Sequence, residues 1–203
     1  MNTKRWIGIR GVSGLVALAL SVVAPRMLAG QAPAPGTVQA DDAEGFKEFS
    51  VRVEAYLKLQ KTVASGIPAL QPTDLPEMIT AYQQALARKI REARPRAKPG
   101  DIFTPAAREA FRHVSRAVLQ GPNSAKSRAY MQSEAPNPGM PLTVNGIYPD
   151  TEPITPLSPE LLAAFPPLPA EVAYRIVGRT LIVIDVESRL VVDIARLILP
   201  PSS

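Results

Sequence analysis

Residues 46–65 carry apolar side chains at spacings that fit two kinds of element. In steps of three and four they form a stripe of Phe46, Phe49, Val53, Tyr56 and Val63. In steps of two they form an alternating row of Phe49, Val51, Val53, Ala55, Leu57 and Leu59. The segment contains no Gly or Pro and is far longer than a usual strand. We therefore predict a helix, with Asp41 and Asp42 as candidate N-caps and Gly66 and Pro68 as its stop.

Two further helical patterns are bounded by capping and helix-breaking residues. In residues 79–93, apolar side chains again repeat every three or four positions. Asp74 is the candidate N-cap of this helix, Pro76 lies in its first turn, and Pro95 ends it. For the stripe within residues 107–118, the corresponding signals are Thr104, Pro105 and Gly121-Pro122. Residues 124–134 predict a short fourth helix.

Proline dominates residues 136–169, where it occupies ten of 34 positions. Because proline fixes φ and lacks an N–H, long helices and central strands are excluded there. We expect an extended belt over the helices, and a disordered linker is the alternative. The apolar anchors of such a belt are Leu142, Val144, Ile147, Leu161, Leu162 and Phe165. Within it we predict a short strand at 142–148 and a short helix at 158–165, capped by Ser158.

The closing stretch, YRIVGRTLIVIDVESRLVVDI (174–194), consists of β-branched runs separated by turn residues. The runs 173–177, 180–184 and 189–194 predict three strands, and Gly178-Arg179 predicts a two-residue hairpin loop. The fold class is therefore α+β. Three to four helices pack with a C-terminal antiparallel three-stranded β-meander, and a proline-rich extended segment links the two. We place one domain at 41–199, with its helical part at 41–134, the belt at 135–170 and the meander at 171–199.

The N-terminus has the pattern of a secretory signal peptide over residues 1–30. A basic start is followed by an uncharged run of 14 residues, Gly11–Ala24, and by small residues suited to cleavage after Ala29 or Gly30. As a helix that run spans about 21 Å, less than the roughly 30 Å hydrocarbon core of a bilayer. We expect a flexible tether at 31–40, export to the periplasm or medium, and no transmembrane segment after cleavage. The absence of cysteine excludes lipid attachment through a lipobox, disulfides and thiolate chemistry.

Removing the leader changes how the charge is interpreted. The chain carries 23 basic and 18 acidic residues, but four of the basic ones precede residue 32, which leaves +1. Nucleic acid is therefore not an expected partner. Residues 86–130 nevertheless hold eleven basic and three acidic side chains, a local charge of +8. The candidate residues for binding an anionic partner, an envelope component or an acidic protein, are Arg88, Arg91, Arg94, Arg108, Arg112 and Arg116. The alternative is neutralisation of these charges within the fold and at the helix dipole.

Little else in the sequence suggests chemistry. Asp185, Glu187 and Asp193 are a weak candidate for a metal site, because a hard cation needs six to eight converging oxygens. We predict instead that Asp185 stabilises a turn with Ser188 and that Asp193 projects to solvent from its strand. His113, the only histidine, is predicted to face solvent. We expect no catalytic residues and no cofactor, since no nucleophile-elbow or phosphate-binding glycine pattern occurs.

Three segments resemble an uncharacterised family of exported bacterial proteins. They are KPGDIFTP (98–105), VNGIYP (144–149) and the closing FPPLPAEVAYRIVGRTLIVIDVESRLVVDI (165–194). The closing segment is similar to a β-ribbon of the form Y-R-x-V-G-R-x-L-x-x-x-D-V-x-x-x-L-x-V-D. The resemblance covers residues 40–200 and implies export and a shared architecture, but it brings no activity and no catalytic residues.

These observations predict an exported, non-enzymatic binding or interaction protein of the bacterial cell envelope. One alternative is a hydrolase acting in the periplasm or medium through carboxylates of the ribbon or of the Asp101 loop. Another is a structural protein whose apolar tail, ARLIL (195–199), pairs with another chain.

Overall fold

The computed structural model describes residues 40–122, 124–132, 139, 141–149, 151–152 and 157–200, which all belong to one compact unit, Pro33–Ser203. The predicted signal peptide at 1–30 and all but the last residue of the predicted tether at 31–40 lie outside the described residues. Within the described ranges, no helix combines the length and the apolar composition needed to cross a membrane.

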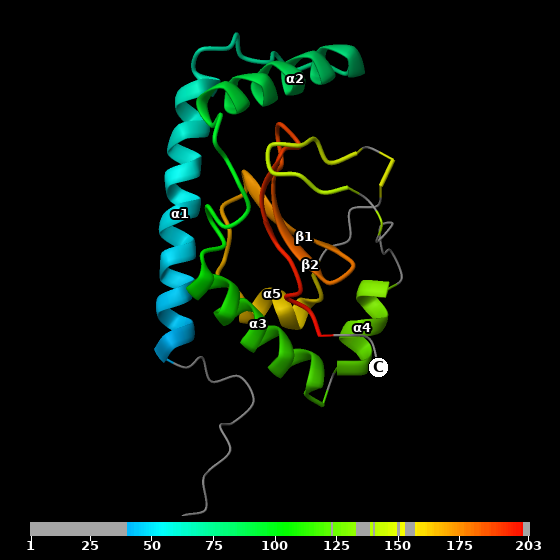
Figure 1. Ribbon diagram of the computed structural model, residues 1–203. Helices are drawn as coiled ribbons and strands as arrows, with labels where there is room; N and C mark the ends of the chain where they lie inside the picture. The colour runs from blue at the N-terminus through cyan, green and yellow to red at the C-terminus, as the bar shows by residue number, and fades with distance from the viewer. Residues whose placement is uncertain are drawn as a thin grey trace, which may run out of the picture. The chain divides into compact units, whose positions relative to one another are not determined.

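The described residues form an α+β fold, as predicted (Figure 1). The helices are α1 (Ala40–Ala64), α2 (Pro76–Ala93), α3 (Pro105–Gln120), α4 (Ser124–Gln132) and α5 (Pro159–Ala164). The strands are β1 (Val172–Val177), β2 (Thr180–Asp185) and β3 (Val191–Ala195). They form one antiparallel sheet in the order β1-β2-β3, which confirms the meander.

The helical interpretation of the first pattern is confirmed by α1. Its buried apolar residues, Phe46, Phe49, Val53 and Tyr56, repeat every three or four positions. Val51, which belongs to the competing two-residue alternation, is 57% exposed. Asp41 and Asp42 lie in the first turn, not before it, so they complement the helix dipole there.

Local capping signals were correct at two helices and wrong at a third. The Thr104 hydroxyl accepts the N–H of Ala107 at the start of α3, and the Ser158 hydroxyl accepts the N–H of Leu161 at the start of α5. Asp74 does not cap α2, whose N-cap position is Leu75 without a side-chain cap. The hydroxyl of Thr73 accepts the N–H of Leu75 instead.

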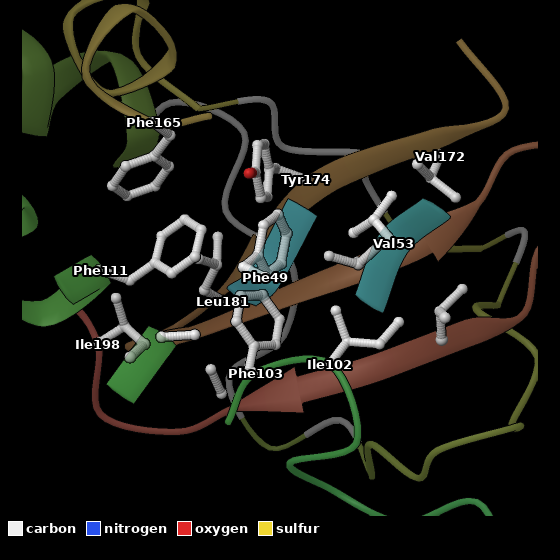
Figure 2. Packing of buried hydrophobic residues seen from close by; sticks show 14 of the residues in the cluster. Phe49, Val53, Ile102, Phe103, Phe111, Phe165, Val172, Tyr174, Leu181 and Ile198 are labelled. Atoms are coloured by element: carbon white, nitrogen blue, oxygen red, sulfur yellow. The ribbon is translucent and has the colours of Figure 1, made fainter. Parts of the chain in front are cut away.

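Both faces of the sheet are covered. On one face, α1, α3 and α5 contribute to a core in which the rings of Phe49, Phe103, Phe111, Phe165 and Tyr174 contact one another (Figure 2). On the other face, Ile182, Ile184, Val191 and Ile194 pack with Tyr148, Leu142 and Val144 of the belt. Because both faces of the sheet are buried, the sequences of the strands are nearly continuously apolar and do not alternate between apolar and polar residues.

The belt follows β3 without forming the strand predicted at 142–148. Its backbone bonds to Val191 through Asn145 and Gly146 and to Arg189 through Tyr148, but only the single bridge Ile147–Leu190 results. Asn145 has φ of 62°, in the left-handed region, which interrupts an extended conformation. The belt is therefore anchored to the sheet edge without extending the sheet as a regular strand.

Candidate functional site

Asp193 is buried among backbone donors, and the prediction that it projects to solvent was wrong. Its exposed fraction is 0%. Its Oδ1 accepts the N–H groups of Gly100 at 2.9 Å and Ile194 at 2.7 Å. Its Oδ2 accepts those of Ile102 and Phe103, both at 2.7 Å. The carboxylate thus holds the loop that leads into α3.

The prediction failed because both faces of the sheet are covered, and an irregularity in β3 determines which face Asp193 lies on. Val183 pairs with Asp193, whereas the next residue, Ile184, pairs with Val191, so Val192 is an extra residue in the ladder. Such a bulge breaks the alternation of faces along the strand. Asp193 therefore shares a face with Val183, which belongs to the core beneath the helices. Burial raises the pKa of this carboxyl group, and the four N–H donors oppose that rise.

Asp185 has the predicted turn role but is also fully buried. Its Oδ1 accepts the N–H of Ser188 at 2.7 Å and its hydroxyl at 2.8 Å. Its Oδ2 accepts the hydroxyl of Tyr56 on α1 at 2.8 Å. Burial raises the pKa of Tyr56, and the charge of Asp185 raises it further. This turn is therefore fixed to the helical layer.

Glu187 is the exposed member of the trio. Its Oε2 accepts a hydrogen bond from the side-chain amide of Gln60 at 3.3 Å. Burial raises the pKa of Tyr82 on α2, and the charge of Glu187 adds to the effect. Among the described residues, no three His, Cys, Asp or Glu side chains are grouped so that they could hold a metal ion. The carboxylates of the ribbon instead connect its turn and last strand to the helices.

His113 was predicted to face solvent, but it forms a contact between helices. Its Nδ1 lies 2.6 Å from the Oδ2 of Asp42 on α1, and its side chain is 40% exposed. The partner carboxylate is 8% exposed. The pair links α3 to the first turn of α1.

Two of the arginines predicted to bind an anion make internal contacts. Arg91 donates from Nε to the backbone oxygen of Asn145 at 2.9 Å. Arg94 donates to the Asn145 side chain at 3.3 Å and to the Val192 carbonyl at 3.3 and 3.4 Å, and its guanidinium lies over the ring of Tyr56. These side chains join the end of α2 to the belt and to β3.

The remaining predicted arginines carry charge that the fold leaves largely unopposed. On α3, Arg112 pairs with Glu109 one turn earlier. Within the described residues, Arg108 and Arg116 have no acidic oxygen within 4.0 Å, and neither does Arg88 on α2. Figure 1 places α2 and α3 against different ends of α1. The six predicted residues are thus divided between the α2 segment, which includes its C-cap Arg94, and α3.

A pocket beside β1 was not found by sequence reasoning. It has a volume of about 220 Å³ and is lined by Leu157, Leu162, Pro166, Pro167, Leu168, Val172, Ala173, Tyr174 and Arg175. The one sequence signal for it is Arg175, a charge at a strand position whose face-sharing neighbours, Ala173 and Val177, are apolar.

Comparison with known proteins gives no relative. No protein-family model matches this chain. No curated protein and no solved structure matches it either.

Proposed function

We propose that this chain is an exported, non-enzymatic binding protein of the bacterial cell envelope that meets an anionic partner through α3. The single observation that carries the proposal is the pair of arginines on α3, Arg108 and Arg116, without an acidic partner in the described part of the chain. The sequence pattern of the leader and the resemblance of the closing ribbon to exported proteins support the location.

The spacing of these side chains suits an extended anionic surface. Arg108, Arg112 and Arg116 follow one another every four residues, about 6 Å along a helix. A guanidinium binds carboxylate or phosphate through two parallel N–H donors, which a lysine cannot reproduce. Near an anionic membrane surface each such charge contributes about 1 kcal/mol, and the contribution decreases with salt.

The test compares two double variants that remove equal charge. Arg108→Ser with Arg116→Ser removes the unopposed pair on α3. Lys58→Ser with Lys61→Ser removes two exposed charges on α1 and serves as the control. In sedimentation with vesicles of anionic and of neutral phospholipid, we expect salt-sensitive binding to the anionic vesicles alone. The α3 variant should bind about tenfold or more weakly than the control. Equal losses in both variants, or no binding to anionic vesicles, would contradict a site on α3.

No observation favours the two alternative functions, a carboxylate-based hydrolase and a structural protein that pairs through its apolar tail. Hydrolysis by ribbon carboxylates needs free carboxylates in a shared pocket, whereas both oxygens of Asp185 and Asp193 accept hydrogen bonds from this chain. Pairing through the tail needs a free strand, whereas Ile198 and Leu199 are buried and their N–H groups donate to the carbonyl of Arg179.

A further inference from the structure

The pocket beside β1 combines apolar walls with a cation that has no counter-ion in the described part of the chain. Within the described residues, no carboxylate lies within 4.0 Å of the Arg175 guanidinium nitrogens. Its Nη1 donates to the carbonyl of Tyr174 at 2.6 Å, and its Nε is buried without a hydrogen-bond partner. Burial lowers the pKa of Arg175. An arginine held partly away from water without an anion is unfavourable, and a carboxylate ligand would relieve that cost.

A second donor is directed to the same edge. The carbonyl of Glu171 accepts from Val186, so odd-numbered residues of β1 direct their backbone groups toward β2. Even-numbered residues direct theirs outward, and the outward N–H of Val172 donates to Pro169. The next outward N–H, that of Tyr174, makes no hydrogen bond among the described residues. Tyr174 and Arg175 both line the pocket, so an outward backbone N–H and a guanidinium, neither of them bonded to an acidic group among the described residues, belong to its wall.

The size of the pocket limits the ligand. A cavity of about 150 Å³ accommodates benzene, and drug-sized ligands need about 300–1,000 Å³. The volume here, about 220 Å³, lies between these values and suits one aliphatic side chain with an attached carboxylate. Three residues of the pocket wall, Leu162, Pro167 and Leu168, are partly or largely exposed to solvent.

We propose that this pocket binds the C-terminal residue of an apolar peptide, with its side chain among the proline and leucine walls and its carboxylate on Arg175 and the Tyr174 N–H. The outward backbone of an edge strand is the element that captures extended peptides in many complexes. This site is separate from the α3 arginines, and its test does not depend on the proposed function.

The first measurement uses matched ligands. N-acetyl-Ala-Leu carries a terminal carboxylate, and N-acetyl-Ala-Leu amide has the same side chains without the charge. In isothermal titration with the full chain, we expect the acid to bind at least about tenfold more tightly than the amide. Amide resonances of residues 162, 168 and 173–175 should shift in NMR spectra. Equal binding of acid and amide, or shifts confined to other residues, would overturn the proposal. Hexanoate is the third ligand, and binding as tight as that of the dipeptide would overturn the assignment to a peptide.

Two pairs of variants separate the pocket from general effects. Arg175→Met removes the guanidinium, and Arg196→Met does the same at an exposed position outside the pocket. Leu162→Ala shortens a half-exposed wall residue, and Leu197→Ala shortens a similarly exposed leucine elsewhere. We expect at least about tenfold weaker binding of the acid to Arg175→Met and a smaller loss for Leu162→Ala. The two control variants should bind as the parent does. If Arg175→Met fails to fold, the Leu162→Ala pair and the acid–amide comparison still decide. Unchanged binding to Leu162→Ala and Arg175→Met would contradict the site.

Discussion

The hydroxyl of Tyr56 on α1 donates to the carboxylate of Asp185 at the end of β2, with 2.8 Å between Oη and Oδ2 across 129 residues of chain. Both residues are buried, and Asp185 also closes the turn that leads to β3. Asp185 therefore combines local bonds to Ser188 within its turn with a long-range bond that ties this turn to the longest helix.

Removing this hydroxyl should be more costly than removing another buried tyrosine hydroxyl. Tyr56→Phe leaves a buried charged oxygen without its donor, so we expect a loss of about 1.5–3 kcal/mol in the free energy of unfolding. Tyr174→Phe removes a bond to the neutral carbonyl of Pro166 and should lose about 0.5–1.5 kcal/mol. Urea denaturation of the two variants measures the difference, and a smaller loss for Tyr56→Phe would contradict the role given to Asp185.

Replacing Asp193 by its amide should destabilise the chain strongly. Asp193→Asn keeps the size of the side chain but replaces one carboxylate oxygen by an NH₂ group. The backbone N–H groups that donate to that oxygen in the parent chain would then face another donor. We expect a loss of about 2–4 kcal/mol, measured by chemical denaturation. The control is Asp74→Asn at an exposed residue that does not cap α2, with an expected change within about 0.5 kcal/mol. Equal effects of the two substitutions would refute the anchoring role.

A glycine in the second turn of α1, Gly45, should resist replacement by alanine. Alanine is normally the better helix former. A Cβ at Gly45, however, would lie 2.7 Å from the backbone oxygen of Ala106 on α3. We expect Gly45→Ala to lower the stability by about 1–3 kcal/mol through overpacking. At Gly66 the nearest atom would lie 3.5 Å away, so Gly66→Ala should be close to neutral. Thermal melts of both variants provide the comparison, and a stabilised Gly45→Ala would show that the two helices can separate.

The contact between α4 and α5 predicts a pH effect. Ser127 donates to Glu160 at 2.7 Å, and this bond is the main reason that the pKa of Glu160 lies below its usual 4.5. A carboxyl group whose pKa is lowered by folding stabilises the fold above its unfolded pKa, and that stabilisation disappears as the pH falls through the folded pKa. Ser127→Ala should therefore raise the pKa of Glu160 in an NMR titration. The difference in the free energy of unfolding between the parent and the variant should become smaller at acidic pH. Ser124→Ala, at the start of the same helix, should leave this pKa unchanged.

Features that depend on neighbouring residues could be predicted from the sequence. Thr104 and Ser158 cap their helices through N–H groups three residues later, and Gly178 has the positive φ, 59°, that its hairpin loop requires. The strand order also follows from short loops between consecutive runs.

Features that depend on distant segments could not be predicted in this way. Asp193 is buried because both faces of the sheet are covered, and a bulge in β3 places it beneath a loop about ninety residues earlier; none of these features leaves a local signal. The contacts of Arg91 and Arg94 also leave no local signal. Their charge suggested an anionic ligand, whereas both side chains donate hydrogen bonds to Asn145 of the belt. The pocket beside β1 exists only once the proline-rich belt has reached the edge of the sheet.

The position of Asp193 also bears on how the chain matures. Its carboxylate is the acceptor for three amides of the 100–103 loop, yet it is synthesised long after that loop. A nascent chain that has not reached residue 193 leaves those amides without their acceptor, so the entry to α3 stays unfinished. Completion of the helical layer is thereby coupled to the arrival of the last strand, a contact between segments far apart in the chain.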